Sequence, residues 1–269
     1  MTTDTRSDVT ADLHSEVTAE ISDGVAVVTL NRPSARNALN LPMCLALTDT
    51  FRTLNADDGV KAVVVQGAGP SFCAGADLKE RKGRDAAWVR GRRQASFEAY
   101  RTIESCRKPV LTLVHGSVVG SGGEIAMAGD FVYAASNTVF KFPEVHWGTV
   151  GATQRLQRVI GKRKAKELLL TNGTLSAGEA LAFGLVLRVI DPDELETVGI
   201  ETARTMAAAP PLSVELTKQA IDLGAELTLE QGIRVEMNAI ERNLADPGWK
   251  DGVDRFAAAH ESRQESDHQ

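Results

Sequence analysis

The segment that decides the fold is Gly67 to Lys79, G-A-G-P-S-F-C-A-G-A-D-L-K, which directly follows a short β-branched run at Lys61 to Gln66. The run has the length and side chains of a buried strand. A second pair of this kind comes later, where Val110 to Val114 leads into His115 to Glu124, H-G-S-V-V-G-S-G-G-E. In α/β proteins, ligands bind beyond the carboxyl ends of parallel strands, and small residues let backbone N–H groups approach them closely. These two segments therefore form the candidate site.

Outward from these segments, apolar runs alternate with helical patterns through the first half of the chain. Ser15 to Ile21 and Val25 to Leu30 are predicted to form a hairpin that turns at Asp23-Gly24. Further expected elements are helices at Leu41 to Leu54, Trp88 to Ile103 and Glu124 to Ala128, and strands at Phe131 to Ala135 and Thr138 to Phe142. Strands separated by helices pair in parallel, so the chain is predicted to be an α/β protein.

After Gly151 the sequence favours helix, with one strand expected at Val186 to Ile190. The expected helices are Thr153 to Ile160, Lys162 to Thr171, Ser176 to Phe183, Glu194 to Ala209, Leu212 to Leu223, Thr228 to Leu244 and Pro247 to His260. We expect residues 15–209 to form a core domain, and residues 210–260 a helical region that covers the core or an oligomer interface. The first dozen residues and Glu261 to Gln269 are expected to be frayed ends.

Composition excludes several classes of protein. The 269 residues are 43% apolar and 25% charged, which is ordinary for a globular protein and excludes a chain disordered throughout. The apolar runs are too short to span a membrane, and Met1 to Leu13 lacks the apolar stretch of a secretory signal. A net charge of −6 and a pI near 5.5 argue against bulk attraction to nucleic acid or to anionic membranes.

The three cysteines, Cys44, Cys73 and Cys106, are odd in number and lack the spacing of metal ligands. They are typical of a reducing compartment, so we expect a cytoplasmic protein without a metal site. Cys73 lies in the first segment, but no basic partner accompanies it, and it is predicted to be a packing residue rather than a nucleophile.

Several motifs together resemble the enoyl-CoA hydratase/isomerase (crotonase) superfamily over roughly Val17 to His260. They are N-R-P-S-A-R-N-A-L-N (Asn31 to Asn40), S-F-C-A-G-A-D-L-K-E (Ser71 to Glu80), G-S-G-G-E (Gly120 to Glu124), F-P-E (Phe142 to Glu144), T-Q-R-L (Thr153 to Leu156) and S-A-G-E-A-L-A-F-G-L-V (Ser176 to Val186). The motifs are most similar to those of enoyl-CoA and methylglutaconyl-CoA hydratases. The resemblance implies a crotonase-like ββα superhelix, with C-terminal helices that pack between the subunits of a trimer or a dimer of trimers.

The resemblance also implies roles for individual residues. The amides of Ala76 and Ser121 would form an oxyanion hole for a thioester carbonyl, and Glu124 and Glu144 would match the paired glutamates of hydratases. The coenzyme A site would be lined by Ala35, Arg36, Ala38, Ala74, Ala76, Asp77, Leu78, Lys79 and Ser121. Coenzyme A is part of the substrate, so no separate cofactor is expected.

The chemistry fits these residue types. Addition of water to an enoyl thioester needs a stabilised enolate, a deprotonated water and a protonated carbon. Two amides meet the first need, at about 3 kcal/mol per donor. Two neighbouring carboxylates can hold one water and divide the acid and base roles, because like charges push their pKa values apart.

Each glutamate also has a structural interpretation. Glu124 ends the capping-box sequence Ser121-Gly122-Gly123-Glu124, and the same pattern recurs at Ser176-Ala177-Gly178-Glu179. If Glu124 were a cap, its carboxylate would occupy the Ser121 N–H that the oxyanion hole needs. Glu144 alone would be a solvated loop residue.

Two departures from the family pattern bear on the reaction. Relatives usually carry glycine where this chain has Ser121, and serine can serve there only without a positive φ. They also have a longer Pro-Gly-Ala-Gly-Gly loop where this chain has only Val150-Gly151-Ala152 between Thr149 and Thr153. Because that loop lies beside the acyl pocket in relatives, the substrate or reaction can differ.

The leading hypothesis is an enoyl-CoA hydratase that uses Glu124 and Glu144. A second enzymatic hypothesis keeps the oxyanion hole but changes the reaction to double-bond isomerisation, retro-aldol cleavage or thioester hydrolysis. A third is a non-catalytic, RNA-binding relative that uses the basic stretch Arg81 to Arg93, although the net charge disfavours nucleic acid. That stretch has six Arg or Lys residues among thirteen and is otherwise interpreted as a solvated face or a contact for the phosphates of coenzyme A.

Overall fold

The computed structural model describes residues 11–14, 16–250 and 252–254. They separate into two compact units, one within Met1–Met206 and the other within Ala207–Gln269. None of the helices among the described residues combines the length and the apolar character needed to cross a membrane.

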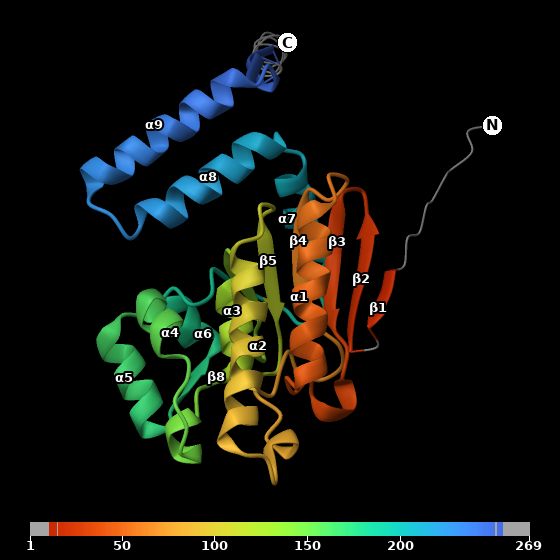
Figure 1. The fold of residues 1–269 in the computed structure, drawn as a ribbon, viewed down its shortest axis with the longest axis vertical. Helices are drawn as coiled ribbons and strands as arrows, with labels where there is room; N and C mark the ends of the chain where they lie inside the picture. The colour runs from red at the N-terminus through yellow and green to blue at the C-terminus, as the bar shows by residue number, and fades with distance from the viewer. Residues whose placement is uncertain (1–10, 15, 251, 255–269) are drawn as a thin grey trace, which may run out of the picture. The chain divides into compact units, whose positions relative to one another are not determined.

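The first unit is built on a seven-stranded sheet with the order β1-β2-β3-β4-β5-β7-β10 (Figure 1). Its strands are β1 (Ala11–His14), β2 (Val17–Ser22), β3 (Val25–Leu30), β4 (Ala62–Gly67), β5 (Val110–Val114), β7 (Phe131–Ala135) and β10 (Arg188–Ile190). The predicted hairpin is confirmed, since β2 and β3 are antiparallel. The predicted parallel pairing is confirmed from β3 through β10, so β4 and β5 end at the same edge of the sheet.

A smaller sheet of three strands has the order β6-β8-β9. It consists of β6 (Ser117–Val119), β8 (Val139–Lys141) and β9 (Thr174–Ser176). β6 lies inside the second glycine-containing segment, so this sheet holds that segment in place. Parallel bridges between Leu39 and Ala76, and between Cys73 and Val118, tie the first segment to the second.

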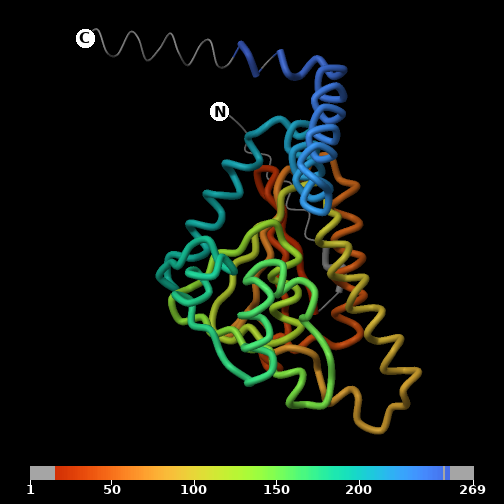
Figure 2. Tube along the Cα trace, turned by 90° about the vertical axis from the view of Figure 1, so that its left-hand side faces the viewer, coloured from red at the N-terminus to blue at the C-terminus, as the bar shows by residue number. Residues whose placement is uncertain are grey.

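The helices follow the sequence pattern closely. They are α1 (Leu41–Ala56), α2 (Ala86–Glu104), α3 (Ser121–Ala128), α4 (Thr153–Ile160), α5 (Lys162–Thr171), α6 (Ala177–Ala182), α7 (Leu195–Ala207), α8 (Pro211–Gly224) and α9 (Leu229–Ala245), with short 3₁₀ turns η1 (Pro33–Ala35), η2 (Lys79–Arg81) and η3 (Glu144–Trp147). Asn40 caps α1 by accepting a hydrogen bond from the Met43 N–H, just before Pro42. The long helices α1 and α2 pack against each other on one side of the sheet (Figures 1 and 2).

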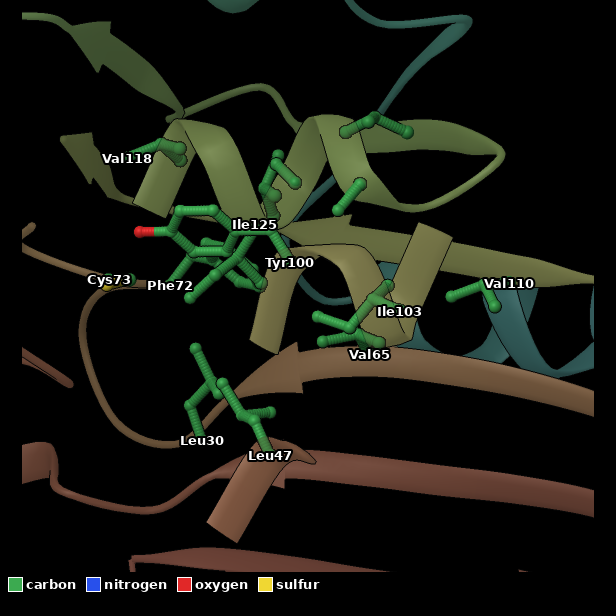
Figure 3. Close-up of a cluster of buried hydrophobic side chains, with 14 of the residues drawn as sticks. Leu30, Leu47, Val65, Phe72, Cys73, Tyr100, Ile103, Val110, Val118 and Ile125 are labelled. Carbon is green, nitrogen blue, oxygen red and sulfur yellow. The ribbon is translucent and has the colours of Figure 1, made fainter. Parts of the chain in front are cut away.

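One apolar core joins the central strands to α1, α2 and α3 (Figure 3). β4 and β5 are buried along most of their length, which is typical of central parallel strands covered on both faces. Phe72 and Cys73 of the first segment belong to the same cluster as Tyr100 of α2 and Ile125 of α3. The segment that follows β4 is therefore anchored in the same core as the helices.

The structure differs from the sequence analysis in several details. The frayed N-terminus was expected to include Ala11, yet Ala11–His14 forms strand β1, and residues 1–10 lie outside the described residues. The short strands β6 and β9 were not predicted, because three-residue strands carry too little periodic pattern. Ser121 does not cap a helix: α3 begins at Ser121, its N-cap is Gly120, and no side chain caps it. The capping box at Ser176 is confirmed.

The second unit contains α8 and α9, which pack against each other. The expected helix from Pro247 to His260 is described in part only, since residues 251 and 255–269 lie outside the described residues. Several large apolar side chains of this unit are exposed, and among them are Ile221, Leu229, Ile233, Met237, Ile240 and Leu244.

Candidate active site

A cleft of about 700 Å³, including the part open to solvent, lies where the two predicted segments meet. Its walls come from the segment after β4, from α2, from the start of α3 and from the segment around η3. The residues predicted from sequence that line it are Ala74, Ala76, Leu78, Ser121, Glu124 and Glu144. The structure thus brings both glutamates and both predicted backbone donors to one cleft.

Hydrogen bonding around Leu39 orients the Ala76 amide. The Leu39 N–H donates to the carbonyl of Gly75, and the Leu39 carbonyl accepts from the N–H of Asp77, both at 2.8 Å. In such a parallel bridge the residue between the two bonded neighbours directs its own N–H and C=O to the opposite side. The Ala76 N–H therefore points away from Leu39, and Ala76 lines the cleft.

Ser121 is the first residue of α3, where backbone N–H groups have no partner inside the helix. The turn is held by the N–H of Glu124, which donates to the Gly120 carbonyl at 3.1 Å. Gly120 carries the positive φ of +47°, and Ser121 is not among the residues with positive φ. Serine is therefore compatible with this backbone, and the left-handed conformation falls on the glycine before it.

Glu124 is 6% exposed and is held from outside its own helix. Nη1 of Arg155, on α4, donates to Oε2 of Glu124 at 2.7 Å. The same guanidinium donates to both carboxylate oxygens of Glu104 at 3.0 and 2.8 Å, and it lies over the Tyr100 ring. The capping-box interpretation of Glu124 is wrong, because its carboxylate is committed to Arg155 rather than to the N–H of residue 121.

Glu144 follows Pro143 at the start of η3 and is half-buried. Its Oε2 atom is buried and has no hydrogen-bond partner within the described residues. A methyl group placed on Gly120 would lie only 2.6 Å from Oε1 of Glu144, so the missing side chain makes room for this carboxylate. Burial raises the pKa of Glu144, and the nearby Glu124 raises it further, while a backbone hydrogen bond and Arg93 act in the opposite direction.

The two carboxyl groups thus have different surroundings within one cleft. Glu124 has an arginine as a direct partner, whereas Glu144 has a raised pKa and, among the described residues, an oxygen without a hydrogen-bond partner. The two carboxyl groups therefore differ in their surroundings, although both line the same cleft.

The remaining predicted residues lie around the cleft rather than in its lining. Asp77 forms an ion pair with Arg32 at 3.2 Å, and its side chain also accepts the Lys79 N–H. The Ala74 N–H donates to the Arg36 carbonyl at 2.9 Å, which attaches the segment containing Ala35, Arg36 and Ala38 to the first wall of the cleft. Arg36 and Lys79 are exposed.

Cys73 is fully buried, and this burial raises the pKa of its thiol to about 12. An uncharged, inaccessible thiol is a packing group, as predicted. Among the described residues, no group of three or more His, Cys, Asp or Glu side chains is placed to hold a metal ion.

Sequence reasoning did not single out Arg155, which holds the carboxylate of Glu124. Arg155 lies inside the T-Q-R-L motif, but nothing in the spacing indicates that it reaches Glu124. The basic stretch Arg81 to Arg93 was interpreted as a solvated face, which is wrong in part. Arg92 is 2% exposed, and its Nε donates to Oε1 of Glu80 at 2.5 Å.

The parallel sheet, the second small sheet and the cleft lined by two glutamates agree with the fold that the motif resemblance implies. The chain belongs to the enoyl-CoA hydratase/isomerase family, whose model matches residues 20–266. The resemblance stated from the motifs is thereby confirmed.

Relatives and solved structures agree with this assignment. The chain is 36% identical over 242 residues to a probable enoyl-CoA hydratase of Rhizobium meliloti, covering 89% of this chain and 93% of the relative. It is 37% identical over 238 residues to a short-chain-enoyl-CoA hydratase of Clostridium acetobutylicum, covering 86% and 90%. The crystal structure of an enoyl-CoA hydratase from Bacillus anthracis matches with a TM-score of 0.88 at 32% identity, covering 91% of this chain and 96% of that one. The fold is therefore the crotonase fold.

Proposed function

We propose that this protein is an enoyl-CoA hydratase that adds water across the 2,3 double bond of an enoyl-CoA thioester. The observation that carries the proposal is the meeting of Glu124, Glu144 and the segments bearing the Ala76 and Ser121 amides in one cleft. The names of the relatives in Rhizobium meliloti and Clostridium acetobutylicum support it.

The thioester carbonyl oxygen would accept hydrogen bonds from the N–H groups of Ala76 and Ser121. Ala76 directs its N–H away from Leu39, and Ser121 offers an N–H at the positive end of α3. Negative charge develops on this oxygen when water attacks C3, so donors fixed in advance stabilise the enolate by about 3 kcal/mol each.

The two glutamates would divide the proton transfers. Glu124, ion-paired with Arg155, would accept a proton from the attacking water as its oxygen bonds to C3. Glu144, whose raised pKa favours the protonated form, would donate a proton to C2. General acid–base assistance of this kind is worth roughly 10²–10⁴ in rate. Afterwards Glu124 releases its proton to solvent and Glu144 takes one up, so the net change is one water added and no cofactor besides the coenzyme A of the substrate takes part.

The coenzyme A moiety would bind along the segments near Ala35, Arg36 and Ala38 and along Ala74 to Lys79. A homotrimer or a dimer of trimers is also proposed, supported by the exposed apolar side chains of α8 and α9. Light scattering at micromolar concentration tests it, with an expected mass of three or six times 28.8 kDa. The proposed location is the cytoplasm.

The reaction is tested by incubating the protein with a panel of 2-enoyl-CoA thioesters and weighing the products by mass spectrometry. Hydration adds one water to the substrate and so raises its mass by about 18 units. An unchanged mass with a moved double bond would instead indicate isomerisation, and free coenzyme A would indicate thioester hydrolysis.

A further inference from the structure

Arg92, on α2, has a side chain that is only 1% exposed. Its guanidinium donates to three different groups. Nε donates to Oε1 of Glu80 at 2.5 Å, Nη1 donates to the Ser96 hydroxyl at 2.6 Å, and Nη2 donates to the Leu39 carbonyl. Ser96 lies one turn later on the same helix, whereas Leu39 and Glu80 belong to other segments. Arg92 therefore ties α2 to two segments outside that helix.

Both of these segments adjoin Ala76, the first proposed donor of the oxyanion hole. Leu39 faces Ala76 in a parallel bridge, and its carbonyl accepts the N–H of Asp77 at 2.8 Å. A backbone carbonyl oxygen has two lone pairs, and Arg92 supplies the second hydrogen bond to the carbonyl of Leu39. Arg92 thus holds the residue opposite Ala76, which sets the direction of the Ala76 N–H.

Glu80 extends this support to the other side. It lies in η2, shortly after Ala76, and its Oε2 accepts the N–H of Leu41 at 2.9 Å. Leu41 is the first residue of α1, so its N–H has no partner inside that helix. The bridge between Leu39 and Ala76 lies outside the named strands, where no continuous ladder holds its register. The pair of Arg92 and Glu80 gives it lateral support.

Stability alone does not account for a buried pair at this place. Desolvation of the two charges offsets their attraction, and apolar side chains of similar volume often stabilise a protein as well or better. A guanidinium differs from them in that its planar fork holds several acceptors at fixed angles. Fixed geometry is what a preorganised N–H donor of an oxyanion hole requires.

We propose that Arg92 is a positioning residue of the oxyanion hole, which keeps the N–H of Ala76 turned toward the cleft. It acts through the Leu39 carbonyl and the Glu80 carboxylate rather than on the reacting atoms. The inference rests on the proposed hydratase function, in which this N–H stabilises the enolate. Arg92 also borders the cleft, so direct contact with the ligand is the competing role, and the experiment separates the two.

The first test is the kinetics of Arg92→Met, which removes the three hydrogen bonds and keeps a long side chain. We expect kcat for crotonyl-CoA to fall about 10- to 100-fold with KM kept, because a displaced N–H weakens an interaction that is strongest in the transition state. Arg92→Lys should recover only part of the rate, since an ammonium group lacks the planar fork. Arg101→Met is the matched control, because it removes an exposed, ion-paired arginine of the same helix.

An infrared measurement separates positioning from stability. Butyryl-CoA, isotope-labelled at the thioester carbonyl, has no double bond to hydrate, and its C=O stretching frequency falls when the oxygen accepts hydrogen bonds. In the wild type we expect the bound thioester to absorb at a lower frequency than free butyryl-CoA. In Arg92→Met the frequency should move back toward the free value, and in Arg101→Met it should not.

The same ligand covers the case in which Arg92→Met does not fold. Arg92→Met combined with Glu80→Gln then replaces it, because the double variant leaves neither charge of the pair without a partner. The glutamine keeps an oxygen that can accept the Leu41 N–H. The same losses of kcat and of the carbonyl shift are expected.

The outcomes are distinct. An unchanged carbonyl frequency in a folded variant refutes the positioning role, whatever happens to kcat. If the affinities for butyryl-CoA and free coenzyme A fall by the same factor as kcat/KM, Arg92 contacts the ligand and the proposal is also refuted. If the wild type hydrates no enoyl-CoA but the variant still loses the carbonyl shift, the hydratase function fails and the positioning role is supported.

Discussion

Arg155 donates from Nη1 to Oε2 of Glu124 at 2.7 Å, and this ion pair joins α4 to α3 through a glutamate that lines the active-site cleft. The side chains of Arg155 and Glu124 are 18% and 8% exposed, so solvent screens the pair only weakly. Within the described part of the chain, Glu144, the second glutamate of the cleft, has no ion-pair partner. The structure therefore distinguishes two carboxyl groups that the sequence presents as equivalent.

Replacement of Arg155 by Met should impair both stability and turnover. It leaves Glu124 buried without its counter-charge, and loss of one partner of a buried pair costs about 3 kcal/mol. We expect a lower melting temperature and a kcat for hydration reduced by about 10- to 100-fold, because Glu124 loses its fixed orientation. Thermal unfolding and steady-state kinetics with an enoyl-CoA measure both effects.

Glu104→Gln is the control for this variant. Glu104 contacts the same guanidinium, but its side chain is 49% exposed, and it does not line the cleft. The loss of an exposed pair costs about 0–1 kcal/mol. A turnover loss in Glu104→Gln as large as that in Arg155→Met would contradict a specific role for the Arg155–Glu124 contact.

The raised pKa of Glu144 predicts a stability that depends on pH. The folded-state pKa of Glu144 lies above the ordinary value of 4.5. The neutral carboxyl group therefore contributes fully to the free energy of unfolding below pH 4.5, and this contribution is lost as pH rises through the folded-state pKa. Glutamine is neutral at every pH. The melting temperature of Glu144→Gln should therefore match that of wild type at about pH 4 and exceed it at about pH 8, where the wild-type carboxyl group must ionise while partly buried.

Circular dichroism melts across this pH range test the prediction. Glu20→Gln removes an exposed glutamate on β2 and should not reproduce the gain at high pH. A Glu144→Gln variant less stable than wild type at pH 8 would show that the charged carboxylate is stabilised in the cleft, against the proposed proton donor.

Gly120 makes the close approach of Glu144 possible. Gly120→Ala would put a methyl group 2.6 Å from Oε1 of Glu144 and impose a side chain on a φ of +47°. The strain costs of the order of 1–3 kcal/mol, and displacement of a reacting group by about 1 Å can cost roughly 10²-fold in rate. We expect both losses in melting temperature and hydration assays.

Gly178→Ala is the matched control, because among the described residues nothing beyond its own helix and chain neighbours lies within 4 Å of the added methyl group, and the position is in helix α6. Alanine there should leave the rate unchanged and stability equal or slightly higher. If Gly120→Ala behaves in the same way, Glu144 does not depend on this glycine for its position.

Most of the fold could be predicted from local pattern. β5, β7, α4 and α5 have the predicted bounds, because their β-branched runs or helical spacing end at clear breaks. The short strands β6 and β9 could not be predicted, because their pairing depends on partners far away in the sequence. The site segments were found from their small residues, and the roles of Ala76, Ser121, Glu124 and Glu144 remain predictions.

The contacts that distinguish the two glutamates could not be read from the sequence. Arg155 reaches Glu124 only after α4 has packed beside α3, and the room that Gly120 leaves for Glu144 exists only after η3 has folded against it. The same limit applies to the basic stretch: spacing alone does not separate the buried Arg92 from the exposed Arg90. Tertiary packing determines which charges are satisfied.

The measurement that tests the central claim most directly is the hydration rate of Glu124→Gln beside wild type, with coenzyme A affinity and melting temperature recorded on the same samples. Glutamine has nearly the same shape but cannot take a proton from water. The account predicts that turnover falls by roughly 10²–10⁴, while the affinity for coenzyme A is kept. Hydration by Glu124→Gln at a rate close to wild type would contradict a catalytic pair of glutamates, and chemistry driven by the oxyanion hole alone would replace it.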